Sequence, residues 1–320
     1  MTIGIAGAGA FGTALGVALA LDDKPVLLWA RDADAAAQMQ TSRENPRLSG
    51  ITLPDQINVT GDLAQLFACQ TILLAMPAQA LRPFLTVHQE QLAGKSLVAC
   101  CKGIDLERMI GPASLISECA PDSTAAMLTG PSFAADIAKG LPTALTLACQ
   151  DEAAGQALQQ QLSTSCLRLY RTTDTIGAEV GGALKNVMAI AAGVAIGAKL
   201  GDSARAALMT RGYPEMPRLA HAFGGRPETL AGLSGFGDLV LTCTSAQSRN
   251  YRYGLALGAG EAFDPKTTVE GAATARAVCK LAAERQLDLP ISRVVADLVD
   301  GRTDIKTALH QLLSRPLKEE

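Results

Sequence analysis

TIGIAGAGAFG, residues 2–12, joins a short apolar stretch that predicts a β-strand to a G-x-G-x-x-G turn. The small apolar residues that follow predict a helix, so the glycines lie between a strand and a helix, as they do in dinucleotide-binding turns. In such a turn Gly7 makes the tight bend, Gly9 lets the backbone approach a pyrophosphate, and Gly12 lets the helix pack against the strand. The N–H groups at the start of the helix hold the anion. We therefore expect a bound dinucleotide, although a glycine-rich turn alone also fits a purely conformational role.

A charged pair, Arg31-Asp32, follows the second predicted strand at residues 26–29. An acidic residue at this place binds the ribose 2′-hydroxyl of NAD, whereas an arginine pairs with the 2′-phosphate of NADP. Arg31 therefore favours NADP, and Asp32 leaves NAD open. The alternative is that the pair is solvated and caps the next helix.

The alternation of apolar strands with helical or loop segments continues over the first half of the chain. Further strands are predicted at residues 57–59, 71–75, 96–100, 125–128, 144–148 and 167–170. This pattern favours an α/β fold with a mostly parallel, doubly wound sheet, in which ligands bind beyond the carboxyl ends of the strands.

Three of these strand ends carry distinctive residues. Met76-Pro77 follows one strand, Lys102-Gly103 follows another, and GPSFA, residues 130–134, follows a third. An apolar wall, a cation and a hydroxyl are thus expected in one crevice. Taken singly, each is also ordinary loop chemistry.

The strand pattern stops near Asp174, and helical periodicity replaces it. We therefore predict two domains, residues 1–174 and 175–320. The first long helix, residues 176–199, is rich in small residues that let neighbouring helices approach closely, and its interior polar groups include Lys185. Burial lowers the pKa of a lysine and makes it a candidate proton carrier. The alternative is a lysine whose stem packs while its ammonium reaches water.

Two later segments add polar chemistry to the helical half. GFGDLV, residues 235–240, places Asp238 among glycine and apolar residues. TCTSAQSRN, residues 242–250, offers hydroxyls, an amide and a guanidinium, a set that suits a phosphate or a carboxylate.

Charge and composition exclude several classes of protein. The net charge is −3 and the basic residues are scattered, so a nucleic-acid partner is not expected. The 8 cysteines show no metal-ligand spacing, which predicts no metal site and reduced thiols in the cytoplasm. The 3 histidines, at positions 88, 221 and 310, lie outside the polar clusters, so histidine-based catalysis lacks support. We expect no secretory signal and no membrane span, because the longest apolar run is shorter than the about 20 residues that a span requires.

Several motifs together resemble the bacterial NAD(P)-dependent glycerol-3-phosphate dehydrogenases. The most specific are GALKNV at residues 182–187, GFGDL at 235–239 and SRN at 248–250. The likeness covers nearly the whole chain, through the glycine turn and residues 102–103, 130–134, 205–208 (RAAL) and 269–271 (VEG).

This resemblance implies a Rossmann domain followed by an all-α substrate domain of the 6-phosphogluconate-dehydrogenase-like type. It also implies reversible reduction of dihydroxyacetone phosphate to sn-glycerol 3-phosphate for phospholipid synthesis with an NAD(P) cofactor, for which Arg31 favours NADP while NAD stays possible. The partner is then a small phosphorylated molecule in the cytoplasm, no metal takes part, and a homodimer is one option for the oligomeric state, which the sequence leaves open.

The resemblance further implies roles by position. Lys185 is the implied proton carrier, with Asp238 and Lys102 in the catalytic centre. The implied substrate contacts are Lys102, Gly130, Ser132, Lys185, Asp238, Ser248, Arg249 and Asn250. The implied cofactor contacts are Gly7, Gly9, Ala10, Phe11, Gly12, Arg31, Lys102, Ala134, Arg249, Thr268 and Glu270.

Two departures from the family pattern stand out. Pro214 and Pro217 lie where the family usually continues a helix, and because a proline costs about 3 kcal/mol in a helix interior, we expect a break or kink there. Ser203 stands where the family more often has asparagine, with no consequence that we can derive.

Two other functions remain open. One is a related lysine-using dehydrogenase of a hydroxy acid, of the 3-hydroxyisobutyrate or 6-phosphogluconate type, because Ser248-Arg249-Asn250 could bind a carboxylate as readily as a phosphate. The other is a dinucleotide-sensing protein without turnover, against which Lys185 and Asp238 argue.

Overall fold

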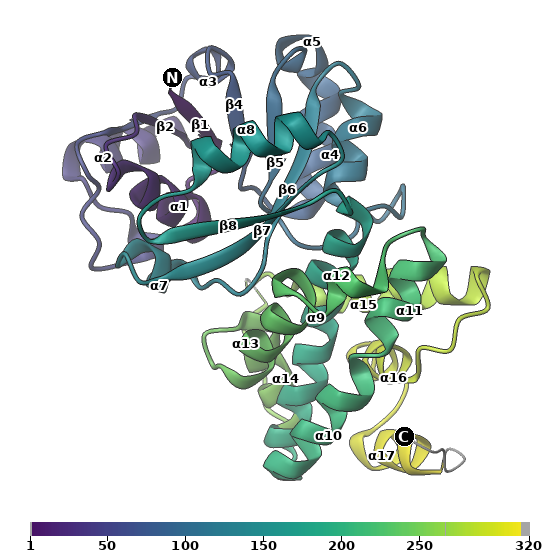
Figure 1. Ribbon diagram of the computed structural model, residues 1–320. Helices are drawn as coiled ribbons and strands as arrows, with labels where there is room; N and C mark the ends of the chain where they lie inside the picture. The colour runs from purple at the N-terminus through teal and green to yellow at the C-terminus, as the bar shows by residue number, and fades with distance from the viewer. Residues whose placement is uncertain (1, 266, 315–320) are drawn as a thin grey trace. The chain divides into compact units, whose positions relative to one another are not determined.

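The computed structural model describes residues 2–265 and 267–314. The chain divides into two compact units, Met1–Glu179 and Val180–Glu320. The first contains a β-sheet with helices, and the second is helical (Figure 1). The long helix α9, Thr175–Gly197, contains the change from one unit to the other.

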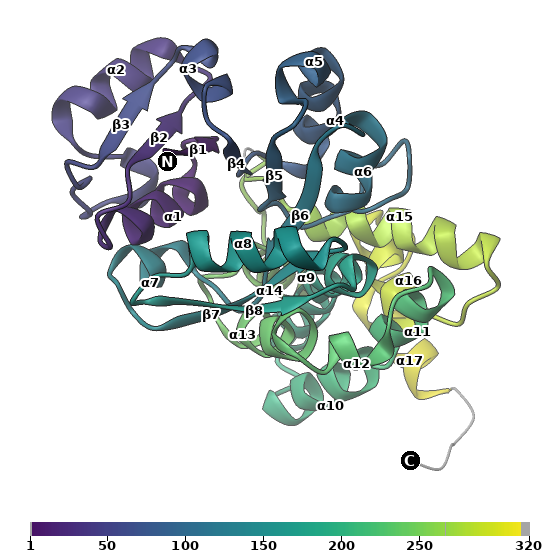
Figure 2. The same ribbon diagram turned by 45° about the horizontal axis from the view of Figure 1, so that its top comes forward.

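An eight-stranded sheet forms the centre of the N-terminal unit, in the order β3-β2-β1-β4-β5-β6-β7-β8 (Figures 1 and 2). Neighbouring strands are parallel except β6 and β7, which are antiparallel. The strands are β1 Ile3–Ala6, β2 Val26–Trp29, β3 Ile57–Thr60, β4 Thr71–Leu74, β5 Ser96–Ala99, β6 Thr124–Thr129, β7 Thr143–Cys149 and β8 Leu167–Thr172. The predicted doubly wound, mostly parallel sheet and all of its predicted strands are confirmed.

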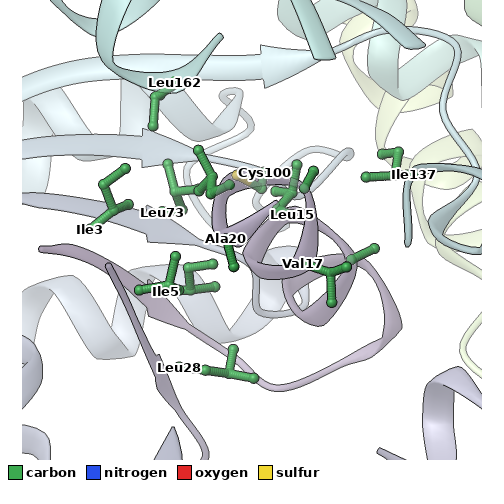
Figure 3. Close-up of a cluster of buried hydrophobic side chains, with 14 of the residues drawn as sticks. Ile3, Ile5, Leu15, Val17, Ala20, Leu28, Leu73, Cys100, Ile137 and Leu162 are labelled. Carbon is green, nitrogen blue, oxygen red and sulfur yellow. The ribbon is translucent and has the colours of Figure 1, made fainter. Parts of the chain in front are cut away.

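Helices cover both faces of this sheet. On one face α1, α2, α7 and α8 pack around Ile5, Leu28 and Leu73 (Figure 3), and on the other α3, α4 and α6 pack around Ile72 and Leu74. The central strands of the sheet are buried on both faces, which is why they are continuous apolar runs in the sequence. The helices of this unit are α1 Ala10–Ala20, α2 Ala33–Ser42, the 3₁₀ turn η1 Pro46–Leu48, α3 Leu63–Phe67, α4 Ala78–Val87, α5 Gln89–Leu92, α6 Pro112–Cys119, α7 Ala134–Ala138 and α8 Glu152–Leu162.

The described residues of the C-terminal unit form helices and no strand. After α9 they are α10 Asp202–Gly212, α11 Glu215–Ala222, α12 Pro227–Leu230, the π-helical turn η2 Leu233–Gly237, α13 Asp238–Thr244, α14 Arg249–Ala259, α15 Glu270–Glu284, α16 Pro290–Val299 and α17 Ile305–Leu313.

Glycines let α9 and α14 approach to backbone contact. A Cβ placed on Gly193 would lie 2.2 Å from the carbonyl oxygen of Tyr251, and one placed on Gly254 would lie 2.2 Å from that of Ile190. Gly197 and Gly258 repeat the contact one turn further along. Any larger side chain would separate the helices, which confirms the close approach predicted from the small residues of α9.

The expected break at the two prolines is also confirmed. α10 ends at Gly212 and α11 begins at Glu215, so Pro214 lies between the two helices. Pro217 lies in the first turn of α11, where proline is tolerated because the first N–H groups of a helix have no partner within it. Thus neither proline interrupts a helix interior.

Helix α9 is long and apolar enough to cross a membrane. It is longer than the apolar run in the sequence on which the expectation of no membrane span was based. However, 89% of its most apolar 18-residue window is buried inside the protein. A core helix of a globular protein has this same pattern, so α9 gives only weak grounds for a membrane location.

Candidate active site

Two glycines of the dinucleotide-type turn are required by the fold itself. Gly7 has φ +125°, which L-residues rarely adopt, and a Cβ there would lie 2.7 Å from the carbonyl oxygen of Ala75. A Cβ on Gly12, in the first turn of α1, would lie 2.1 Å from the carbonyl oxygen of Gly7. These two residues therefore have the bending and packing roles predicted for them.

Gly9 is different, because nothing in the protein requires a glycine there. Its φ is −77°, which any residue adopts, and no atom of the described residues lies within 4 Å of the place where a Cβ would stand. Gly9 precedes the first turn of α1 and provides no side-chain cap to that helix. An open face beside the N–H groups of a helix N-terminus fits the pyrophosphate of a dinucleotide.

Arg31 and Asp32 have separate tasks after β2. Oδ1 of Asp32 accepts hydrogen bonds from the N–H groups of Asp34 at 3.1 Å and Ala35 at 3.0 Å, so Asp32 caps α2. The side chain of Arg31 is exposed. The capping alternative therefore holds for Asp32, while Arg31 is accessible to a ligand.

Three predicted site residues meet at one carbonyl group in the N-terminal unit. Nζ of Lys102, after β5, donates to the carbonyl oxygen of Gly130 at 2.9 Å, and Oγ of Ser132 donates to the same oxygen at 3.1 Å. Gly130, after β6, has φ +134°, which explains the glycine. The structure thus brings together a cation and a hydroxyl at the carboxyl ends of neighbouring strands, close to Ala134 at the start of α7.

Lys185 and Asp238 form a buried ion pair in the C-terminal unit. Lys185 is 7% exposed and Asp238 is 1% exposed, and Nζ lies 3.1 Å from Oδ1. Nζ also donates to Oγ1 of Thr242 at 2.8 Å, and this hydroxyl donates to Oδ1 of Asp238 at 3.1 Å. The lysine is therefore largely buried and its ammonium is held by Asp238 and Thr242, which argues against the alternative of an ammonium that extends into water.

The backbone before Asp238 explains how the carboxylate reaches α9. A Cβ on Gly181 would lie 2.3 Å from the carbonyl oxygen of Ser234, so η2 lies directly against α9. A Cβ on Gly235 would lie 2.1 Å from the carbonyl oxygen of Leu230, so the π-helical turn itself requires a glycine. Such turns occur frequently at functional sites.

Thr242 is a site residue whose role the sequence reasoning did not assign. It is 3% exposed and lies one helical turn after Asp238 on α13, so both side chains point to the same side. The spacing of four residues was the available signal. The neighbouring Cys243 is not a candidate nucleophile, since burial raises the pKa of its thiol to about 12.

Ser248, Arg249 and Asn250 form the N-terminus of α14. Oγ of Ser248 accepts a hydrogen bond from the N–H of Tyr251 at 3.2 Å and so caps the helix. Oδ1 of Asn250 accepts from the N–H of Gly271 at 2.9 Å, while the side chain of Arg249 is exposed. Ser248 and Asn250 therefore also have structural roles, and a guanidinium stands at the start of an 11-residue helix, where anions are favoured.

The bond from Asn250 links two predicted motifs. Gly271 is the second residue of α15, and a Cβ there would lie 2.6 Å from the carbonyl oxygen of Asn186. Glu270, the first residue of α15, is thus held beside the SRN segment, and the exposed Thr268 precedes it.

Glu179 is a second buried carboxylate, which lies in the N-terminal unit. Its two oxygens accept hydrogen bonds from the N–H of Ser114 at 2.8 Å and from Oγ of Ser114 at 2.9 Å, at the start of α6. A Cβ on Gly111 would lie 2.3 Å from the carboxyl carbon of Glu179. Burial raises the pKa of Glu179 to about 7, although the hydrogen bonds from Ser114 oppose the shift.

The histidines have no role at these sites. His88 packs against the rings of Phe67 and Phe84, with centroid distances of 5.1 and 5.0 Å, while His221 and His310 are exposed. Within the described part of the chain, no group of three or more His, Cys, Asp or Glu residues could hold a metal ion.

Two family models match the chain. Residues 2–155 match the N-terminus of NAD-dependent glycerol-3-phosphate dehydrogenase, and residues 174–310 match its C-terminus. The chain belongs to this family. A glycerol-3-phosphate dehydrogenase [NAD(P)+] of Cereibacter sphaeroides is 64% identical, over 99% of this chain and 100% of the relative.

Further relatives agree with this membership. An enzyme of the same name from Ruegeria sp. is 62% identical over 100% of both chains. A crystal structure of glycerol-3-phosphate dehydrogenase from Coxiella burnetii superposes with a TM-score of 0.92 at 36% identity, covering 98% of this chain and 99% of that one. As a member of this family, the chain is an NAD(P)-dependent oxidoreductase.

Proposed function

We propose that the protein interconverts dihydroxyacetone phosphate and sn-glycerol 3-phosphate with NAD(P)H and supplies glycerol 3-phosphate for phospholipid synthesis. The observation that carries the proposal is the buried group of Lys185, Asp238 and Thr242, which holds one ammonium in a fixed position from which a proton can be given. Family membership supplies the reaction class, and the buried lysine supplies the chemistry.

The nicotinamide supplies the hydride when the cofactor is bound. Lys185 gives the proton to the carbonyl oxygen that becomes the hydroxyl, and in the reverse direction it takes that proton back. Asp238 keeps the ammonium charged before the transfer, because an opposite charge at 3.1 Å favours the protonated lysine. Thr242 fixes the direction of Nζ, since its hydroxyl accepts from Lys185 while it donates to Asp238.

Arg249 binds the phosphoryl group of the substrate, aided by the donors at the start of α14. A guanidinium offers a planar fork of donors that matches phosphate oxygens. Ser248 and the amide nitrogen of Asn250 flank it, and Lys102, Gly130 and Ser132 complete the proposed substrate contacts. Binding energy from this remote group can also orient the reacting carbonyl.

The dinucleotide binds at the turn of residues 7–12, with its pyrophosphate over Gly9 and its 2′-phosphate on Arg31, so that NADP is preferred over NAD. The remaining proposed contacts are Ala10, Phe11, Lys102, Ala134, Arg249, Thr268 and Glu270. In this scheme residues 1–174 form the cofactor domain and residues 175–320 the substrate domain. A cytoplasmic location is supported by the eight cysteines, none of which forms a disulfide within the described residues.

The test is NADPH oxidation by the purified protein, followed at 340 nm after addition of dihydroxyacetone phosphate. We expect turnover with this substrate, and reduction of NADP⁺ by sn-glycerol 3-phosphate in the reverse direction. A panel of keto acids serves as the control. Turnover of a keto acid without turnover of the phosphorylated ketone would establish a hydroxy-acid dehydrogenase, and cofactor binding without any turnover would establish a sensing protein.

A further inference from the structure

Asn45 is a buried asparagine that lies far in sequence from the glycine turn but is bonded to it. It is 3% exposed, and Nδ2 donates to the carbonyl oxygen of Ala8 at 3.1 Å and to Oγ1 of Thr13 at 2.7 Å. Oδ1 accepts from the N–H of Arg47 at 3.0 Å. Both hydrogens of the amide and one acceptor site are therefore in use.

These bonds join three segments of the N-terminal unit. Ala8 lies between the first two glycines of the turn, Thr13 lies in α1, and Arg47 lies in η1. As the residue before η1, Asn45 needs only an acceptor to cap it, and serine or aspartate would serve equally well. Among these capping residues only asparagine also carries an N–H₂ group. The hydrogen bonds that the amide donates to the glycine turn therefore explain why position 45 is an asparagine, whereas capping η1 alone does not.

The bond to Ala8 fixes the direction of the next N–H. A trans peptide is planar, and its C=O and N–H point in opposite directions. Holding the carbonyl of Ala8 toward Asn45 therefore holds the N–H of Gly9 away from Asn45. The space beside Gly9, where a Cβ would stand, is open within the described residues.

We propose that Asn45 is a positioning residue for the pyrophosphate of the dinucleotide. It holds the Ala8–Gly9 peptide in the orientation that presents an N–H, and not a carbonyl oxygen, to the anion. The turn needs such support, because the glycines on both sides of Ala8 allow this peptide to rotate more freely than other residues would. The inference rests on the dinucleotide site proposed above and adds a residue to its support.

The experiment compares two ligands and uses the full-length protein. NADP⁺ contains the pyrophosphate, whereas adenosine 2′-monophosphate keeps the adenine, the ribose and the 2′-phosphate but lacks it. Asn45→Asp keeps the acceptor for Arg47 but replaces both donors by an oxygen that repels the carbonyl of Ala8. Asn58→Asp, at an exposed asparagine on β3, makes the same chemical change away from the turn.

Calorimetric titration should show NADP⁺ bound about tenfold more weakly by Asn45→Asp, as expected for one or two misplaced hydrogen bonds to an anion. The affinity for adenosine 2′-monophosphate should stay close to that of the unaltered protein. In turnover assays the KM for NADPH should rise, while kcat at saturating NADPH and the KM for dihydroxyacetone phosphate stay unchanged. Asn58→Asp should leave all of these values unchanged.

An unchanged affinity for NADP⁺, or an equal loss for both ligands, would overturn the inference, since a general loss of folded structure weakens both. If Asn45→Asp does not fold, Thr13→Val replaces it: the isosteric variant removes one of the two acceptors of Nδ2 and should weaken NADP⁺ selectively, by a smaller factor. An unaltered protein that binds adenosine 2′-monophosphate but not NADP⁺ would refute the pyrophosphate site, and one that binds neither would refute the proposed cofactor.

Discussion

Replacing Glu179 by glutamine should change how the stability of the N-terminal unit depends on pH. The carboxyl group of Glu179 is buried, and its pKa is about 7, compared with 4.5 for an unperturbed glutamate. Each unit of pKa difference corresponds to about 1.4 kcal/mol, so the difference amounts to about 3 kcal/mol. Glutamine has nearly the same shape and keeps a partner for both groups of Ser114.

The sign follows from which state binds the proton more tightly. Below pH 4.5 the carboxyl group is protonated in both the folded and the unfolded chain, so it contributes no pH dependence. As the pH rises from about 4.5 to about 7, the unfolded chain loses the proton first, and the folded state loses stability. We therefore expect Glu179→Gln to be nearly neutral at pH 4.5 and more stable than the unaltered protein by up to about 3 kcal/mol at pH 8.

Urea unfolding at several pH values, followed by tryptophan fluorescence, measures this difference. Trp29 is the single tryptophan of the chain and lies on β2, in the same unit as Glu179. Glu152→Gln, at an exposed glutamate in the first turn of α8, is the matched control and should show the pH dependence of the unaltered protein. A Glu179→Gln variant that loses stability relative to the unaltered protein as the pH rises would show that the folded state holds an ionised carboxylate, and the reasoning would be wrong.

Four further predictions concern catalysis, cofactor choice, substrate binding and packing. Lys185→Ala should lower kcat about 10² to 10⁴-fold, as expected for loss of a general acid, with an unchanged dissociation constant for NADPH; near-normal turnover would remove Lys185 from the mechanism. Arg31→Ala should weaken NADPH binding by about 1.5 to 3 kcal/mol and leave NADH unaffected, whereas equal losses would mean that Arg31 does not read the 2′-phosphate. At saturating NADPH, Arg249→Ala should strongly lower kcat/KM for dihydroxyacetone phosphate but hardly for unphosphorylated dihydroxyacetone, and equal factors would mean that Arg249 serves the cofactor or the fold. Gly254→Ala should cost about 1 to 3 kcal/mol in thermal unfolding, because its Cβ would lie 2.2 Å from the carbonyl oxygen of Ile190; an unchanged melting temperature would show that α9 and α14 can separate freely.

The strands could be predicted because each leaves a local mark in the sequence. Strands that are buried on both faces appear in the sequence as short apolar runs. Glycines that the fold requires, because of a positive φ or a backbone contact, can be recognised within these runs or at their ends. Lys185 was identifiable for a similar reason, since a charged residue in an apolar helix is conspicuous. The sequence did not show whether the ammonium of Lys185 is buried or reaches water. The structure shows that Nζ forms an ion pair with Asp238 at 3.1 Å.

The hydrogen-bond partners of the site could not be predicted, because they depend on which residues the fold brings together. Thr242 is one of many threonines, and its hydroxyl matters only because α13 lies beside Lys185. Likewise, the sequence suggested Asn250 as an anion ligand but gave no sign that it also caps the distant helix α15. Such caps require knowledge of tertiary contacts.

The helices differ in which group accepts hydrogen bonds from the N–H groups of their first turn. α6, α15 and α16 have no side-chain cap of their own, and each receives an acceptor from elsewhere in the chain: Glu179 for α6, Asn250 for α15 and Glu215 for α16. An acceptor at such a place satisfies N–H groups that water cannot reach, but it also fills the position that an anion would take.

At α1 the preceding residue is Gly9, and the nearby polar side chain, Asn45, turns its donors toward Ala8 and Thr13 without supplying an acceptor to the first turn. A carboxylate there would complete the helix and repel a pyrophosphate. With a pyrophosphate bound at α1 as proposed, the same physical rule accounts for a glycine at a place where the described residues do not require one.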